Sequence, residues 1–257
     1  MRVKDSWTPR DSGSYRPAMV APRWLGVIGG MTWRASAEYY RIANELVAVQ
    51  SGAPHSAYVT MVSPDFAPLV RALAAGRPDD VAAVLVDAAR RLAVTDPAVV
   101  VLAANTAHLW FDQVRAEVRC PVVHVAEGVH RAAAEAGVTR LGILGTTATA
   151  RAQVYRHGIG SRTEIVHPQV DAQEALHRLI TVDLAARGPC PEDAALLATV
   201  AADLVAAGAE AVVLGCTEFS GMRLPLDVPV FDSTALHVRA ALDRPTCDEP
   251  DSVGTWP

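Results

Sequence analysis

Short apolar runs alternate along this chain with longer stretches in which apolar residues recur at helical spacing. The runs are rich in β-branched residues and predict strands at residues 24–28, 57–62, 98–102, 122–125, 141–144, 164–166, 211–214 and 228–231. The amphipathic stretches predict helices at 35–49, 78–93, 125–136, 148–155, 171–186 and 191–207. Because near-continuously apolar strands need cover on both faces, this alternation predicts an α/β fold of parallel sheets flanked by helices.

Two junctions between a strand and the following loop occur twice along the chain. Residues 25–32 return as 141–148, where Leu141 lies 116 residues after Leu25. Residues 101–106 return as 213–218, where Val213 lies 112 residues after Val101. Two repeats at nearly one offset indicate a duplicated unit. We therefore expect two lobes related by pseudo-two-fold symmetry, with the loops after their strands facing one cleft that holds the active site.

The repeat and the composition shifts divide the chain into lobes and arms. We place the first lobe at residues 23–122 and 223–241, and the second lobe at 123–222. Residues 1–22 and 242–257 are polar and proline-rich, and we expect them to form a loose N-terminal arm and a loose C-terminal tail.

Composition narrows the class of protein. The chain has 257 residues, of which 51% are apolar, and a net charge of −5, so it can bury a large core. The absence of a lysine and arginine cluster argues against nucleic-acid binding, and the absence of a long apolar run argues against membrane insertion. Its four cysteines show no CxxC spacing and its histidines no metal-binding spacing, so we expect a cytoplasmic protein without a metal.

Cys216 is the first candidate for chemistry. It follows an apolar strand and precedes Thr217 and Glu218, so we expect it at a strand's carboxyl end beside the start of a helix. There, hydrogen-bond donors would lower the thiol pKa from its usual value of about 8.5. Lowering that pKa to about 7 needs roughly 2 kcal/mol of preferential stabilisation of the anion. The other interpretation is a small buried packing residue, which is common for cysteine.

The segment Asn105-Thr106-Ala107-His108 is the second candidate. Asn105 and Thr106 place an amide and a hydroxyl at a strand end, where they suit a carboxylate or an enolate oxygen. His108 is either a general acid and base or a packing residue in the first turn of a helix.

Four segments, in this order, resemble motifs of the aspartate/glutamate racemase family. They read GGMTWRASAEYYR at 29–41, ANTAH at 104–108, LGCTE at 214–218 and FDSTALH at 231–237. The resemblance extends over roughly residues 24–240. It implies two Rossmann-like lobes, a cofactor-free active site between them, a homodimer, and a small amino acid or dicarboxylate as substrate. It also implies two-base proton transfer at Cα, for which a duplicated cleft places equivalent side chains on both faces of a planar carbanion.

The resemblance assigns roles to particular residues. Cys216 is one base, and Ala104 occupies the position of the other. The substrate-binding residues that it implies are Gly30, Met31, Arg34, Asn105, Thr106, Thr146, Thr217, Glu218 and His237.

The sequence departs from the family pattern at two places. Family members usually carry a cysteine where this chain has Ala104, so a symmetric two-thiol mechanism is impossible here, and water, Thr106 or His108 would relay a proton on that side. One branch of the family carries an arginine where this chain has Phe66, which cannot bind an anion. Either Arg34 replaces that cation or the substrate is less polar than aspartate.

Three functions remain open from the sequence. The first is a cofactor-independent amino-acid racemase or epimerase that uses Cys216. The second is a decarboxylase of the arylmalonate type, in which a single cysteine protonates an enolate and Ala104 is an expected feature. The third is a homologue that binds an amino acid without turning it over.

Overall fold

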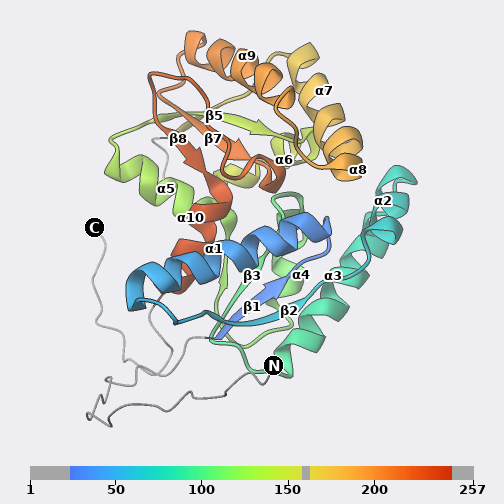
Figure 1. Cartoon of the computed structure of the whole chain (residues 1–257). Coiled ribbons are helices and arrows are strands. Elements are labelled where there is room, and N and C mark those ends of the chain that lie inside the picture. Colours follow the sequence, from blue (N-terminus) through green and yellow to red (C-terminus); the bar gives the residue numbers. More distant parts are fainter. Residues whose placement is uncertain (1–23, 158–162, 245–257) are drawn as a thin grey trace, which may run out of the picture.

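The protein is described here by a computed structural model, which places residues 24–157 and 163–244. Residues 1–22 and 245–257 of the expected arms lie outside the described residues. The described chain forms two parallel sheets, one above the other in Figure 1, with helices around each of them. No helix of the described part has the length and apolarity needed to cross a membrane.

The first sheet has the strand order β2-β1-β3-β4, and all of its neighbouring pairs are parallel. Its strands are β1 (Trp24–Ile28), β2 (Tyr58–Val62), β3 (Val99–Leu102) and β4 (Val122–Val123). The helical segments that connect them are α1 (Trp33–Ser51), α2 (Phe66–Ala74), α3 (Pro78–Ala93), the 3-10 turn η1 (Thr106–Trp110) and α4 (Phe111–Arg115).

The second sheet repeats this pattern with the order β6-β5-β7-β8, again with parallel neighbours. Its strands are β5 (Arg140–Gly145), β6 (Glu164–Val166), β7 (Ala211–Gly215) and β8 (Val230–Asp232). The helical segments are α6 (Thr147–Arg151), η2 (Val154–Arg156), α7 (Val170–Arg178), the π-helical η3 (Leu179–Leu184), α8 (Ala185–Arg187), α9 (Asp193–Ala206) and η4 (Thr217–Phe219). The equal strand order confirms the duplicated α/β architecture that the repeat predicts.

Alternate residues of each central strand enter different cores, which explains why the strands are apolar throughout. Val100 and Leu102 of β3 pack with α3, whereas Val99 and Val101 pack with α1 and with the last helix, α10 (Ser233–Leu242). In β7, Val212 and Val213 divide in the same way between two clusters. Burial on both faces gives each sheet most of its hydrophobic stabilisation.

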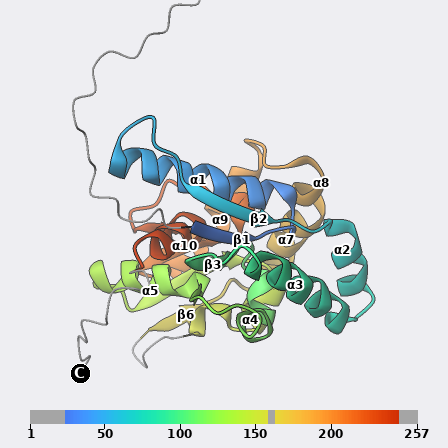
Figure 2. The same ribbon diagram turned by 90° about the horizontal axis from the view of Figure 1, so that it is seen from below.

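The two lobes exchange their last helices. Helix α5 (Val125–Glu135) follows β4 of the first sheet but packs against β8, η2 and α10. Helix α10 follows β8 of the second sheet and packs against α1, β3 and β4 of the first. Both views show α5 and α10 side by side between the sheets (Figure 1 and Figure 2).

This exchange changes the lobe boundary expected from the sequence. Residues 223–241 were expected to lie in the first lobe, but β8 is hydrogen-bonded to β7 in the second sheet. Only α10 returns to the first lobe. The reason is that β8 completes the second sheet as β4 completes the first, and each is followed by a helix that crosses between the lobes.

Candidate active site

The loops that follow the strands of both sheets open onto one cavity of about 550 Å³ between the lobes. The first lobe lines it with residues of the β1–α1 turn, α2 and the loop after β3. The second lobe contributes the β5–α6 turn, the α7–η3–α8 segment and the loop after β7. The cavity therefore lies where parallel α/β sheets generally bind ligands, outside the carboxyl ends of their strands.

Ala104 and Cys216 take equivalent places in this cavity. Ala104 follows β3 and Cys216 follows β7, and both β3 and β7 are inner strands at the same position of their sheets. Both side chains line the cavity and are largely buried, with exposed fractions of 8% and 9%. One lobe thus presents a thiol and the other a methyl group.

Burial raises the pKa of the Cys216 thiol to about 12. The backbone N–H of Glu218 donates to the sulfur and opposes this rise, while the nearby Glu218 carboxylate adds to it. The thiol activation expected from an adjoining helix start is therefore not found. The physical reason is the burial of the sulfur, and η4, at three residues, is too short to oppose that burial with much helix dipole. Cys216 is protonated at neutral pH in the cavity without ligand.

The Glu218 carboxylate faces the cavity and links the two lobes. Its Oε1 accepts a hydrogen bond of 2.6 Å from the hydroxyl of Thr32, which belongs to the first lobe. Thr32 is also the N-cap of α1, where its hydroxyl accepts from the backbone N–H of Ala35. Burial raises the pKa of Glu218, against the opposing effects of the Thr32 bond and of Arg34.

A second link between the lobes mirrors the first. Thr146 is the N-cap of α6 and accepts from the backbone N–H of Thr149, and its hydroxyl lies 3.3 Å from that of Thr106. In each lobe, therefore, the threonine that caps the helix after the first strand contacts the loop after the third strand of the other lobe. The pseudo-symmetry extends to individual hydrogen bonds.

Asn105 and His177 bring unpartnered polar atoms to the cavity wall. Asn105 is buried, and its Oδ1 accepts a hydrogen bond of 2.5 Å from the Tyr155 hydroxyl, whereas its Nδ2 has no partner among the described residues. The Nδ1 of His177 is likewise buried without a partner in the part of the chain that the structure covers. Buried polar groups are normally hydrogen-bonded, so both atoms are candidates for contact with a ligand.

His177 was not among the residues expected from the sequence. It lies on α7, four residues before Thr181 and eight before Ala185, and all three line the cavity. This i, i+4, i+8 spacing on the expected helix at 171–186 is the signal that could have placed His177 on the face turned toward the cleft.

His108 and His237 are hydrogen-bonded to other parts of the protein. The Nδ1 of His108 donates to the Ala104 carbonyl at 3.0 Å, and its Nε2 accepts from the backbone N–H of Val125 at 3.1 Å. His237 Nδ1 accepts from the Tyr39 hydroxyl at 2.8 Å, and its Nε2 donates to the Val123 carbonyl at 2.9 Å.

Neither histidine belongs to the described lining of the cavity. Burial lowers the pKa of His108 to about 3 and that of His237 to about 4, so both rings are neutral at physiological pH. The geometry therefore favours the packing interpretation of His108 over the acid–base role. His237 is held behind the described lining by its two hydrogen bonds, and a contact with a ligand stays a prediction of the resemblance.

Gly30 and Arg34 lie outside the described lining as well. Gly30 has φ +92°, and a Cβ there would lie 2.5 Å from the Pro64 carbonyl oxygen, so the turn requires glycine. The Arg34 guanidinium donates to the Ala185 carbonyl at 3.4 Å and lies over the Trp33 ring at 4.9 Å. Arg34 thus bridges α1 to α8.

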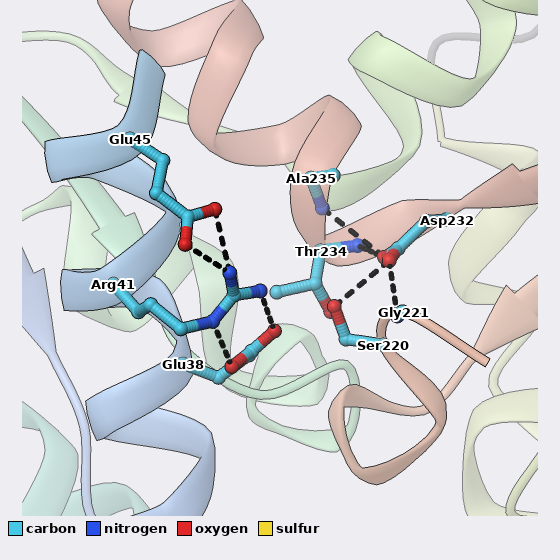
Figure 3. Close-up of polar contacts among 8 residues, drawn as sticks. All are labelled: Glu38, Arg41, Glu45, Ser220, Gly221, Asp232, Thr234 and Ala235. Atoms are coloured by element: carbon cyan, nitrogen blue, oxygen red, sulfur yellow. Dashed lines mark hydrogen bonds and ion pairs between the residues drawn. The ribbon is translucent and has the colours of Figure 1, made fainter. Parts of the chain in front are cut away.

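Asp232 fixes the loop that follows Cys216 and Glu218. Its Oδ1 caps α10 by accepting from the backbone N–H groups of Thr234 and Ala235. Its Oδ2 accepts from the Ser220 hydroxyl at 2.8 Å and from the Gly221 N–H at 2.9 Å (Figure 3). The FDSTALH segment that contains Asp232 was recognised in the sequence, but this function was not.

The whole cavity falls within a family match. The sequence profile described as Asp/Glu/Hydantoin racemase matches residues 28–241. The chain belongs to this family. The matched residues include all of the second sheet, the first sheet from the end of β1 onward, and every described residue that lines the cavity, so the family's shared region contains the candidate site.

Solved structures of this racemase family share the architecture. A Yersinia pestis protein provisionally named an Asp/Glu racemase is 32% identical, with 86% of this chain and 98% of that chain covered and a TM-score of 0.76. An aspartate racemase homologue from Pyrococcus horikoshii OT3 is 27% identical, with coverages of 86% and 97% and a TM-score of 0.71.

Glutamate racemase from Francisella tularensis, solved with D-glutamate, is 14% identical, with coverages of 85% and 79% and a TM-score of 0.57. At this identity it shares the fold alone.

Proposed function

We propose that the protein is a cofactor-independent isomerase of the racemase or epimerase type, in which Cys216 transfers a proton at the α-carbon of a small amino acid. The observation that carries this proposal is the position of the Cys216 thiol, which lines the cavity between two pseudo-symmetric lobes. Membership of the racemase family supports it. The homodimer and cytoplasmic location that the family resemblance implies belong to the same proposal.

The polar residues beside Cys216 suit the backbone groups of an amino acid. The Glu218 carboxylate would bind the substrate ammonium group, because burial of opposite charges strengthens their attraction. The free Nδ2 of Asn105 and the hydroxyls of Thr106 and Thr217 would donate to the substrate carboxylate. In this orientation the α-carbon lies between the Cys216 and Ala104 positions.

Ala104 makes the two faces of the substrate unequal. Cys216 in its thiolate form removes the Cα proton on one face and becomes a thiol, and the carbanion takes a proton from the other face to complete inversion. A methyl group has no proton to give, so water, directly or through the Thr106 hydroxyl, supplies it on the Ala104 side, and the hydroxide that remains takes up the proton released when the Cys216 thiol ionises again. We expect proton exchange on the Cys216 face to be much faster than inversion.

A second function is favoured by one specific observation, the methyl group at Ala104, and it agrees with the burial that raises the pKa of Cys216 and favours its thiol form. In decarboxylation of a malonate, the C–C bond breaks, CO₂ leaves, and its electron pair stays on the α-carbon as an enolate. The Cys216 S–H then gives its proton to that carbon, and water reprotonates the thiolate. This reaction needs one donor, and a thiol that is already protonated can act without prior ionisation.

Restoring the missing base tests the racemase proposal. In D₂O, the unaltered protein should exchange the Cα proton of its amino acid, and Cys216→Ala should abolish exchange. Ala104→Cys should raise the rate of inversion by roughly 10²–10⁴, the usual contribution of a positioned acid or base. NMR measures exchange, and chiral chromatography measures inversion.

Controls separate the three functions. Cys190→Ala removes a thiol from the loop before α9, away from the cavity, and should leave exchange unchanged. Exchange that persists in Cys216→Ala would contradict the role of the sulfur. Release of CO₂ from a prochiral malonate with one product enantiomer would instead favour the decarboxylase. Equal ligand binding by the parent and Cys216→Ala proteins, with neither reaction, would favour a binding protein.

A further inference from the structure

We propose that the substrate carries an apolar, uncharged side chain of aliphatic or aromatic kind, and that Phe66 is the main residue that selects it. This inference rests on the proposed function in one respect, namely that the reacting carbon lies at Cys216. The apolar side chain would occupy the part of the same cavity that extends from the strand ends to α2 and η3.

Two helical segments from opposite lobes make this part of the cavity apolar. Helix α2 contributes Phe66, Val70 and Leu73, which recur at intervals of four and three residues on one helix face. The segment η3 and the adjoining α8 contribute Ile180, Val182 and Ala185. In Figure 1, α2 stands at the edge of the first lobe and faces α8 across the space between the lobes.

Several of these apolar side chains are exposed to solvent in the protein without ligand. The exposed fractions are 42% for Val70, 40% for Leu73 and 56% for Val182. Clustered apolar exposure of this kind marks a binding surface, because burial by an apolar ligand is favourable in proportion to the area removed from water. The cluster is continuous with the cavity that contains Cys216, so a small ligand held at the thiol would extend onto it.

Charge argues against an acidic side chain in this cavity. Its described lining contains no lysine and no arginine, and its carboxylate, Glu218, would repel a second substrate carboxylate. His177 lines the cavity and its unpartnered Nδ1 offers one hydrogen bond, whereas Arg34 lies outside the lining and is bound to the Ala185 carbonyl and the Trp33 ring. A desolvated carboxylate that lacks both a cationic partner and a set of hydrogen-bond donors, such as the donors proposed for the α-carboxylate, is strongly disfavoured.

Phe66 is held in place before any ligand binds. It is the first residue of α2, and the preceding Asp65 caps that helix by accepting from the backbone N–H of Ala67 at 3.2 Å. The half-buried ring packs against the same first-lobe core as Met31. A fixed aromatic wall selects an apolar group at little entropic cost. The cavity volume of about 550 Å³ also falls within the roughly 300–1,000 Å³ typical of sites for larger ligands than aspartate.

Substrate preference in Phe66→Arg tests the inference. The panel consists of L-leucine, L-phenylalanine, L-aspartate and L-glutamate, and the readout is kcat/KM for Cα proton exchange in D₂O. The parent protein should prefer an apolar member over both acidic ones by at least about tenfold, since a few methylene contacts are worth that much. Phe66→Arg should lower this ratio by about tenfold or more. Val94→Arg adds the same charge at a position that is 86% exposed and outside the cavity, and should leave the ratio unchanged.

Measurements of ligand affinity test the side-chain inference independently of the proposed function. Titration calorimetry of the panel with Cys216→Ala measures recognition without turnover. If an apolar member binds most tightly but the parent protein exchanges none, the side-chain inference stands and the proposed chemistry fails. Tighter binding of aspartate or glutamate, or no binding by any member, would overturn the inference. So would a change in oligomeric state in Phe66→Arg with no change in preference, because the apolar surface would then be an interface between copies of the chain.

Discussion

Tyr39 and Tyr155 occupy equivalent positions in the two halves of the chain, 116 residues apart, and serve different partners. The Tyr39 hydroxyl bonds to His237 behind the first sheet, away from the cavity. The Tyr155 hydroxyl donates to Asn105, whose amide nitrogen is free at the cavity wall. Of the two repeated tyrosines, therefore, only Tyr155 positions an amide, that of Asn105, which is a candidate for ligand binding.

Replacing each tyrosine by phenylalanine separates these roles. Tyr155→Phe frees Asn105 to rotate, so kcat/KM for exchange should fall by about three- to tenfold, which corresponds to the loss of one hydrogen bond at the upper part of the roughly 0.5–1.5 kcal/mol range. Tyr39→Phe should lower the free energy of unfolding by a similar amount and change kcat/KM less than twofold. Steady-state kinetics and urea unfolding measure both quantities. Equal kinetic losses in the two variants would contradict a positioning role for Tyr155.

For single residues, the sequence identified much of the cavity wall. Met31, Ala104, Asn105, Thr106 and Cys216 all line the cavity, as do the expected Thr146, Thr217 and Glu218. The neutral, buried states of His108 and His237 could not be predicted, because they depend on contacts made in the folded chain, with Val125 at the start of α5 and with Tyr39 of α1. The raised pKa of Cys216 depends on burial in the same way.

Among the elements, periodicity located the strands well and some helices incompletely. The helix expected at 78–93 is α3 with the same bounds. The helix expected at 148–155 is interrupted, because Gln153 adopts a left-handed conformation with φ +51° between α6 and η2. Helix α2 was not expected, since it is short and contains Pro68, which is tolerated only because it lies in the first turn.

The packing of α5 on α10 gives a prediction for Gly128. Alanine in a helix interior is normally more stable than glycine by about 1 kcal/mol. At Gly128, however, a Cβ would lie 2.4 Å from the backbone carbonyl oxygen of Leu236. Gly128→Ala should therefore lower the free energy of unfolding, by roughly 1–3 kcal/mol as for other overpacked sites.

Urea denaturation measures this effect, and the exposed Ala134 of α5 supplies the control. Ala134→Gly should lower the free energy of unfolding by about 1 kcal/mol through helix propensity alone. If Gly128→Ala stabilised the protein, the close approach of α5 and α10 would be disproved.

For the whole molecule, buried histidines between the lobes predict loss of stability in acid. Burial holds the pKa of His108 at about 3 and that of His237 at about 4, and lowers that of the neighbouring His124, all from an ordinary value of 6.5. Below pH 6.5 the unfolded chain therefore binds protons that the folded chain does not. The resulting stabilisation of the unfolded state grows until the pH falls through the folded pKa values.

Urea unfolding between pH 6 and 5 should show the free energy of unfolding falling by about 1.4 kcal/mol per pH unit for each such histidine. His237→Gln removes one of these histidines and should therefore reduce the slope by about 1.4 kcal/mol per pH unit. A pH-independent free energy of unfolding over this range would be inconsistent with buried neutral rings.

The repeat predicted two lobes but not how they are joined. A sequence offset shows that two segments have similar structure, whereas periodicity shows only which face of a helix is apolar. Neither shows which sheet that face covers. The crossing of α5 and α10, and with it the place of β8 in the second sheet, became apparent only from the contacts between elements.

The place of α10 has a consequence for biosynthesis. Val238, Ala240 and Ala241 belong to the same buried cluster as Leu25 and Val27 of β1. A ribosome delivers the β1 residues long before those of α10, so one face of the first sheet stays partly uncovered until α10 has been synthesised. Nascent chains that stall after the second sheet would display this apolar face to chaperones.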